Sequence, residues 1–366
     1  MIPYVEVIGK LVNNITQIHE TFAMVEPSDC WFEVKFFDYG EFEVYAPVTQ
    51  SNLNALKNGN YVKIPNLPYL WVIKSVDYAF SSDGAKMLDV KGFEAKWILN
   101  QRIIKNPVFL SNDLSTAFYN LINDNIVNPS ERWRKMIGFN VELPDYTITI
   151  DDTLAPRSNL WEFIRDLLKA NNCGVYATFE NGIIIFKSRQ GVNKPALVFS
   201  QSMDNLISSD YFENSENYKN FIRVVSTFSE KTDNDENIDV DYIKDYPSTT
   251  QEGINLYEMV IQSNLSTKYV DENGQEQETN PSSALYQQWQ LQEGKNKLSE
   301  QFILKQFTGE IDLQHSNYKF GSDFFIGDLV TIRDEYFGYE GLTRVLKYTF
   351  KQDAKGYGEE AEYGNE

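Results

Sequence analysis

The sequence predicts a mainly β protein that contains an α+β insertion. Tyr and Phe, which favour strands, are frequent, with 22 and 24 residues. Short segments with alternating apolar and polar side chains recur along the chain, whereas two segments near its middle have the apolar spacing of helices. Because 366 residues are too many for one core of ordinary size, we expect two small β-barrel-like domains at residues 1–102 and 211–366, separated by an α+β domain at 103–210.

The first barrel-like domain is predicted from a hairpin near its start. Phe32, Val34 and Phe36 alternate with polar residues, and after a turn at 38–40 the alternation resumes at Phe42, which is the pattern of a β hairpin. A short helix is expected at 51–57, and strands are expected at 61–64, 71–80 and 86–91. Strands at this spacing favour a small barrel.

The inserted domain is predicted from two amphipathic segments. The apolar residues of 114–122 fall at i, i+3, i+4, i+7 and i+8, which places them on one face of a helix, with Ser111 or Asn112 as its cap. The same spacing recurs at 160–168, where Asn159 can cap the helix. A strand is expected at 146–150 between the two helices.

A hairpin should follow the second helix. Residues 174–179 and 183–187 are strand-like, and Asn181-Gly182 between them suits a tight type I′ turn. These residues complete the predicted α+β domain.

The second barrel-like domain is expected to contain a polar helix and loop excursion at about 230–300. Residues 229–245 and 271–281 are rich in Asp, Asn, Glu and Gln, which predicts exposed loops. Residues 283–307 have few apolar positions, so we expect a helix at a surface or against a partner.

The most distinctive stretch is the last fifty residues. An aromatic run leads into Gly327-Asp328, and strands are predicted at 329–333 and 344–350, on either side of a glycine-rich loop at 336–341. The polar residues 356–360 are expected to form a tail beyond the last strand.

Charge and composition exclude several classes of function. With 33 basic and 53 acidic residues the net charge is −20, which repels nucleic acid and anionic membranes. The excess serves solubility, or it gives a conduit for DNA a lining of low adhesion. No membrane-spanning run or secretion signal is present in the sequence, so we expect a soluble protein made in the cytoplasm. Cys30 and Cys173 stand apart, which predicts no disulfide.

No catalytic or cofactor-binding residue is predicted. His19-Glu20 could open a zinc-binding HExxH motif, but Ala23 occupies the position of the second histidine. The chain has no GxSxG, GxxxxGK or GxGxxG motif. Asp151-Asp152 could be imagined as the acid pair of a glycosidase, although adjacent carboxylates of this kind are typical of caps and turns.

No metal-ligating residue is predicted either. Asp233, Asp235 and Asn237 have the spacing of the first ligands of a calcium loop. Ile238 replaces the turning glycine, however, and Lys244 replaces the bidentate glutamate. A solvated acidic loop is therefore the preferred interpretation.

The order of these segments resembles the siphophage tail-tip hub family, whose relatives serve as baseplate hubs and also occur in tail-like particles. The resemblance rests on residues 40–47, on 199–225, which contain Phe199-Ser200-Gln201, and on 318–347, which contain Gly327-Asp328. It covers nearly the whole chain. Many relatives continue into a lytic or fibre-bearing segment that this sequence lacks, so the resemblance implies a hub without enzymatic activity or a cofactor.

The resemblance also implies an assembly. In the family, three chains form a pseudo-six-fold ring of barrels around the DNA channel, and DNA passes through it without specific binding. The implied partners are two further copies of the chain, the tail tube or distal tail protein, the tape measure protein, and tip or fibre proteins. The implied location is the virion tail, assembled in the host cytoplasm, without a membrane anchor.

One alternative comes from the aromatic content. A carbohydrate-binding β module or a glycosidase of a cell-surface-targeting protein would use exposed indole rings as sugar platforms. Trp71, Trp97 and Trp289 are the candidates. Oligosaccharide titration separates this alternative from the hub.

Overall fold

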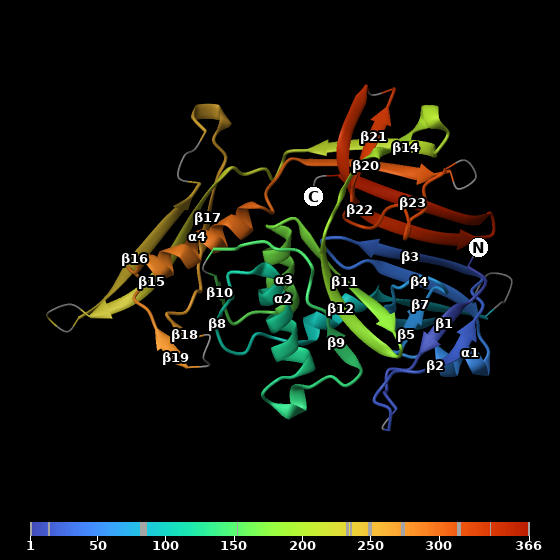
Figure 1. Cartoon of the computed structure of the whole chain (residues 1–366), viewed down its shortest axis with the longest axis horizontal. Coiled ribbons are helices and arrows are strands. Elements are labelled where there is room, and N and C mark those ends of the chain that lie inside the picture. The colour runs from blue at the N-terminus through green and yellow to red at the C-terminus, as the bar shows by residue number, and fades with distance from the viewer. Residues whose placement is uncertain are drawn as a thin grey trace.

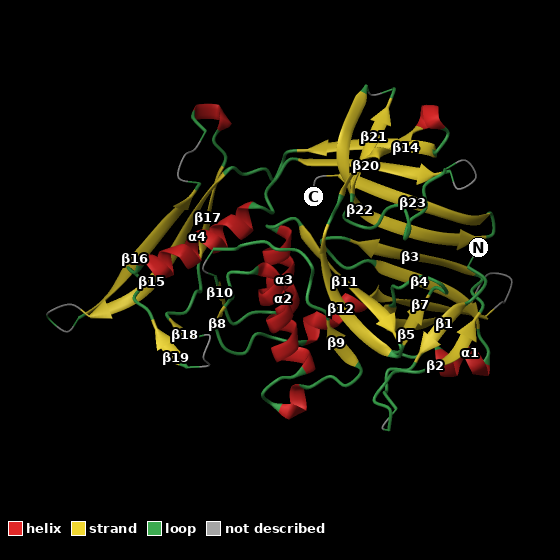
Figure 2. Ribbon diagram, in the orientation of Figure 1, coloured by secondary structure: helices red, strands yellow, loops and turns green. Residues whose placement is uncertain are grey.

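The computed structural model describes residues 2–13, 15–80, 86–151, 153–231, 234, 236–247, 251–271, 275–312, 316–336 and 338–364. The fold is mainly β, as predicted (Figure 2). Its described strands form one sheet of 13 strands, one of four and two of three. The large sheet lies at the right of Figure 1, the helices α2 and α3 at the centre, and a smaller sheet with α4 at the left.

The large sheet contains strands from both ends of the chain. Its path runs β14-β20-β23-β22-β3-β4-β7-β6-β5-β1-β2, and β21 pairs with both β22 and β13. The early strands are β1 (Val5–Ile8), β2 (Thr21–Val25), β3 (Asp29–Lys35), β4 (Glu41–Pro47), β5 (Tyr61–Lys63), β6 (Trp71–Phe80) and β7 (Lys86–Glu94). The later strands are β13 (Asn193–Ser200), β14 (Leu206–Asn214), β20 (Leu304–Ile311), β21 (Leu329–Asp334), β22 (Tyr339–Asp353) and β23 (Gly356–Gly364).

The prediction of two barrels is wrong for the described strands, because none of their sheets closes. The 15-residue β22 explains the difference. Its first part pairs with β21, and its second part, from Lys347 to Gln352, pairs with β3. The edge of β3 is therefore covered by β22, so the early strands extend the sheet of the later ones instead of closing on themselves.

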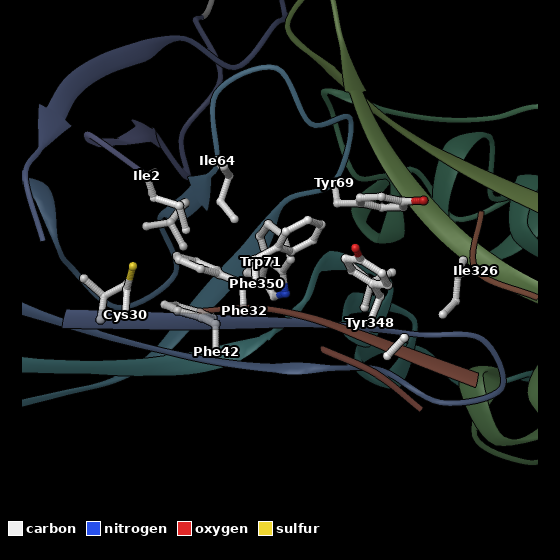
Figure 3. Close-up of a cluster of buried hydrophobic side chains, with 14 of the residues drawn as sticks. Ile2, Cys30, Phe32, Phe42, Ile64, Tyr69, Trp71, Ile326, Tyr348 and Phe350 are labelled. Carbon is white, nitrogen blue, oxygen red and sulfur yellow. The ribbon is translucent and has the colours of Figure 1, made fainter. Parts of the chain in front are cut away.

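The junction of β3 and β22 is covered by one of the hydrophobic cores, to which both ends of the chain contribute. Phe32 stacks on Phe42 with ring centroids 5.5 Å apart, and Phe350 of β22 lies in the same cluster (Figure 3). Trp71 is buried and its Nε1 donates a hydrogen bond to the Glu33 carbonyl at 2.8 Å. Burial of each large apolar side chain contributes about 1.5–3 kcal/mol, so the two ends of the chain stabilise each other.

The α-helices in the described part of the chain are α1 (Gln50–Ala55), α2 (Leu114–Ile122), α3 (Leu160–Lys169) and α4 (Ala284–Leu298). The sequence predicted α2 at its observed bounds, but its cap is Asp113, whose side chain accepts from the Thr116 amide at 2.9 Å. Ser111 and Asn112 precede the position where a side chain can reach the first free amides. The apolar faces of α2 and α3 share a second core with strands β11 and β12.

Substitution Asn159→Ala is expected to destabilise the protein by about 1 kcal/mol, because Asn159 is the predicted and observed cap of α3. Its Oδ1 accepts from the amides of Trp161 and Glu162 at 2.9 and 3.2 Å. Urea denaturation measures the loss. Glu162→Gln keeps both amides capped and serves as the control; an equal loss in the two variants would contradict the assignment.

The sheet beside α2 and α3 contains β9 (Phe139–Val141), β11 (Cys173–Glu180) and β12 (Ile183–Gln190). Asn181 and Gly182 connect β11 to β12 with φ of 51° and 80°, which confirms the type I′ turn. The strand predicted at 146–150 does not form; the described residues of this segment make only an isolated bridge between Thr149 and Asp113.

The small sheet at the left of Figure 1 corrects the prediction of a loop at 229–245. β15 (Phe221–Lys231) and β16 (Asn237–Tyr246) form an antiparallel hairpin, and β17 (Glu258–Gln262) pairs with β15. Polar residues suit this hairpin because they pair across strands: Arg223 binds Asp245 through two bonds of 2.8 Å. The four-stranded sheet consists of β8 (Val108–Phe109), β10 (Leu154–Ala155), β18 (Lys268–Val270) and β19 (Glu276–Glu278).

Helix α4 ends earlier and lies deeper than predicted. It stops at Leu298, and the end of the segment predicted as helix belongs to β20. Its polar residues are buried against β15 and β16, where Gln290 donates to Ser226 and to the Tyr242 carbonyl, both at 2.9 Å. A helix of low apolar content can be buried here because the sheet offers hydrogen-bond partners.

The predicted polar tail is a central strand. β23 lies between β20 and β22 in the large sheet. Ala361 and Tyr363 point into the core with no exposed surface, while Glu362 between them points to the other face. The prediction failed because it weighed the glutamates and not the alternation that follows them.

Candidate functional site

The Gly327-Asp328 turn is the centre of a joint between the large sheet and the region inserted into it. Asp328 has no exposed surface. One carboxylate oxygen accepts from Arg189 Nη2 and from the Val192 amide at 3.0 Å. The other accepts from the Phe325 amide at 3.0 Å and lies 3.2 Å from Lys194 Nζ. One side chain thus ties β12 and β13 to the start of β21.

Gly327 is required by close packing on the same turn. Its φ is +89°, and a Cβ there would lie 2.1 Å from Phe36 Cε2. Arg344 donates to the Gly327 carbonyl at 2.8 Å, and its guanidinium lies 5.3 Å from the centroid of the Phe36 ring. Burial lowers the pKa of Arg344. The Gly-Asp motif therefore has a structural reason: glycine admits the Phe36 ring, and aspartate binds the neighbouring strands.

A second buried ion pair joins the early strands to the inserted region. Lys96 Nζ lies 3.2 Å from Glu94 Oε2 and donates to the carbonyls of Val175, at 2.9 Å, and Lys35. Glu94 accepts from the amides of Gly40 and Lys35 at 2.6 and 3.0 Å. Burial raises the pKa of Glu94 and lowers that of Lys96, because each charge has lost its water. The pair persists through these additional hydrogen bonds.

The sequence did not predict the ion pairs of Asp328 and Glu94. Glu94, Lys96, Arg189 and Lys194 lie outside the strands predicted at 86–91 and 183–187. The contacts of Lys96 with Val175 and of Arg189 with Asp328 join residues that are far apart along the chain. A sequence shows no signal for such contacts except the presence of charge next to apolar runs.

Several of the candidates for chemistry cannot be placed. Asp152, Asp233 and Asp235 lie outside the described residues, and Asn237 begins β16. Among the residues that are described, no group of three or more His, Cys, Asp or Glu is placed to hold a metal ion. Burial raises the pKa of both Cys30 and Cys173 to about 12, so neither thiol is a ready nucleophile.

The three imagined sugar platforms are covered. Trp71 and Trp289 are buried, and the Trp97 ring is stacked with Phe93 and lies under Lys74 Nζ at 3.9 Å. A sugar needs a free aromatic face, so these residues do not support the carbohydrate alternative.

A cavity of about 700 Å³ lies beside α2. Its polar wall includes Lys105, Asp124 and Arg134. Arg134 is held by the Ile103 carbonyl at 2.7 Å and by Asn125 at 3.1 Å. Lys105 also pairs with Glu131, another lining residue. Charges that are neutralised by one another within the wall suggest no particular reaction.

No helix in the described ranges has the length and apolar content required to cross a membrane.

Comparison with known proteins identifies the family of this chain. The sequence profile of the siphovirus ReqiPepy6 Gp37-like protein family matches residues 24–365. This chain belongs to that family. No curated protein matches it in sequence.

By fold, this chain is similar to solved structures of phage tail proteins. The tail protein from Neisseria meningitidis MC58 has a TM-score of 0.54 and 12% identity, with 99% of this chain and 96% of that chain covered. The 43 kDa tail protein of prophage MuSo2 from Shewanella oneidensis has a TM-score of 0.50 and 12% identity, with 98% of each chain covered. Identities this low show the fold alone. Together with the family, they confirm the resemblance to phage tail proteins.

Proposed function

We propose that this protein is the hub of a phage tail tip, where three copies form a pseudo-six-fold ring between the tail tube and the distal tip. The observation that carries the proposal is the family match over residues 24–365. The division into parts at 1–102, 103–210 and 211–366 belongs to the same proposal. The large sheet supports it, because strands from both ends of the chain lie in one continuous surface that a tube could adjoin.

The buried ion pairs fit a protein that transmits force. The ion pair of Arg189 with Asp328 connects elements that are distant in sequence. Lys96, which pairs with Glu94, makes a second such connection through its hydrogen bond to the Val175 carbonyl. Such pairs fix one relative position of the elements they join. A hub that transmits force between tube and tip needs this fixed geometry more than it needs an active site.

The test of the assembly is a count of copies. Cryo-EM of assembled tails should show three copies per tip, and the early and late strands of each copy should superpose on each other as two equivalent ring segments. Six copies per tip, or segments that do not superpose, would remove the ring from the proposal.

The channel gives a further expectation. With a net charge of −20, acidic side chains should line the passage, so that DNA slides through without binding. The potential of the channel wall in the same reconstruction decides this point: a neutral or basic wall would refute it.

The same proposal covers partners, location and activity. The hub would contact the tail tube or distal tail protein, the tape measure protein and tip or fibre proteins, after assembly in the host cytoplasm. It would not hydrolyse peptidoglycan or glycosides. Release of muropeptides by the purified chain, abolished by a substitution within it, would overturn the non-enzymatic assignment.

A further inference from the structure

His19 is one of only two histidines in the chain, and its side chain is 2% exposed. It lies on the segment that connects β1 to β2, residues 9–20, of which all but residue 14 are described. Its ring meets Tyr61 of β5 and Phe139 of β9 nearly at right angles, with centroids 5.4 and 5.5 Å apart. The imidazole is therefore packed between the large sheet and the inserted region.

The connecting segment is anchored to the inserted region at this residue. The His19 amide donates to the Gly182 carbonyl at 2.7 Å. Gly138 has a φ of +84°, and a Cβ there would lie 2.5 Å from His19 Nε2. Gly182 has a φ of +80°, and a Cβ there would lie 2.9 Å from the His19 carbonyl oxygen. The two glycines leave room for the histidine in the two turns that receive it, one before β9 and one between β11 and β12.

The hydrogen bonds of the ring identify its neutral form. Nδ1 lies 3.0 Å from the Gly9 carbonyl oxygen, which can only accept, so Nδ1 carries the proton. Nε2 is buried and has no hydrogen-bond partner. A proton added to Nε2 would create a buried positive charge with no acceptor for its N–H. Burial accordingly lowers the pKa of His19.

The charged groups on the surrounding elements do not offset this cost. On the same segment, Glu20 Oε1 accepts from Asn13, and the Lys10 side chain lies along Gly59. On the receiving turn, Glu180 pairs with Lys187 at 2.8 Å. On β5, Tyr61 stays neutral because burial raises its pKa.

We propose that His19 is a pH-sensitive latch, which holds the described residues of this segment, 9–13 and 15–20, on the inserted region while neutral and releases them when protonated. The segment also carries Leu11 and Ile15, which are 86% and 92% exposed. Release would let these apolar side chains move relative to the body of the protein. The proposal is independent of the hub assignment, since it rests on contacts within one chain.

The direction of the pH effect follows from the two protonation states. A released histidine has a pKa near 6.5, whereas the packed one has a lower pKa. The docked state is fully favoured above about pH 6.5 and loses this advantage as the pH falls toward the pKa of the packed ring. Because one proton is taken up on release, the opening constant should rise about tenfold per pH unit in that window.

Hydrogen exchange measured by mass spectrometry tests the latch on the full chain. Exchange of peptides within residues 9–20, corrected for the intrinsic effect of pH, should change little above about pH 6.5 and show this rise as the pH falls from there toward 5. His315→Gln removes the other histidine and should leave the rise unchanged. His19→Phe keeps an aromatic ring without a titrating group and should abolish it.

Two further measurements keep the proposal falsifiable if His19→Phe folds poorly. Gly138→Ala, which pushes a methyl group onto Nε2, should open the segment at pH 7 as well. The NMR titration of the wild-type His19 ring should give a pKa below 6.5. A titration at or above 6.5, or exchange in 9–20 that is unchanged by pH after correction, would overturn the latch.

Discussion

Asp328→Ala is expected to lower the free energy of unfolding by about 3–5 kcal/mol. The substitution removes a carboxylate with no exposed surface and leaves Arg189 and Lys194 without their buried partner. It also leaves the amides of Val192 and Phe325 without the oxygen that accepts from them. Buried donors that lose their acceptor keep the cost of desolvation without its compensation. Urea denaturation monitored by tryptophan fluorescence measures the loss.

An exposed ion pair provides the matched control. Asp245 also binds an arginine through good geometry, with two bonds of 2.8 Å to Arg223, but both side chains are well exposed. Asp245→Ala should cost at most about 1 kcal/mol, because water replaces the lost partner. Similar losses for the two variants would show that Asp328 is not the centre of the joint.

Local sequence patterns correctly predicted the elements whose formation depends on neighbouring residues. The spacing of apolar residues predicted α2 and α3, and Asn181-Gly182 predicted the turn between β11 and β12. In each case the signal and its effect lie within a few residues. The alternation near the C-terminus likewise predicted β21 and the closing strand β22.

The architecture depends on pairings that no local pattern reports. β3 and β22 lie more than 300 residues apart and are neighbours in the large sheet. Either strand could have closed a barrel within its own half, and its alternation would be the same. The choice between a closed and an extended sheet is made by the length and edges of the partner strand, which a single sequence does not display.

The predictions for the polar segments were wrong for a different reason. They treated charge as a sign of loops, but several charged residues of β16 and β23 lie on one face of each strand, where they pair with side chains of the neighbouring strand. Glu362 of β23, for example, lies 2.9 Å from Lys347. Composition averaged over ten residues conceals this alternation, and the averaged signal of a two-faced strand resembles that of a loop.

Only one side of the contact around Asp328 was predicted from the sequence. Gly327-Asp328 stood out as punctuation between an aromatic run and a strand, and the structure gives each residue a task. The partners Arg189 and Lys194 could not be predicted, since their position opposite Asp328 depends on the parallel pairing of β13 with β21. The sequence alone therefore indicated Gly327-Asp328, whereas its partners became known only from the fold.

Lys96→Met is the second substitution for which we expect a large effect, a loss of about 3–5 kcal/mol at neutral pH. Methionine fills the space of the lysine stem but leaves Glu94 buried without a cation, and the carbonyls of Lys35 and Val175 lose a donor. Lys91→Met is the control, because Lys91 pairs with Glu43 at 2.7 Å with a side chain that is half exposed. That change should cost less than about 1 kcal/mol.

The pH dependence distinguishes a lost charge partner from lost packing. Without Lys96, the pKa of Glu94 should rise further above its unfolded value, because burial already raises it and the compensating cation is gone. A carboxyl whose folded pKa is raised takes up a proton on folding, so the variant should recover stability as the pH falls from 8 toward 5. Glu94→Gln added to Lys96→Met should restore part of the loss at pH 8 and remove the pH dependence. A deficit that is constant from pH 5 to pH 8 would mean that the lysine stem, and not its charge, stabilises the junction.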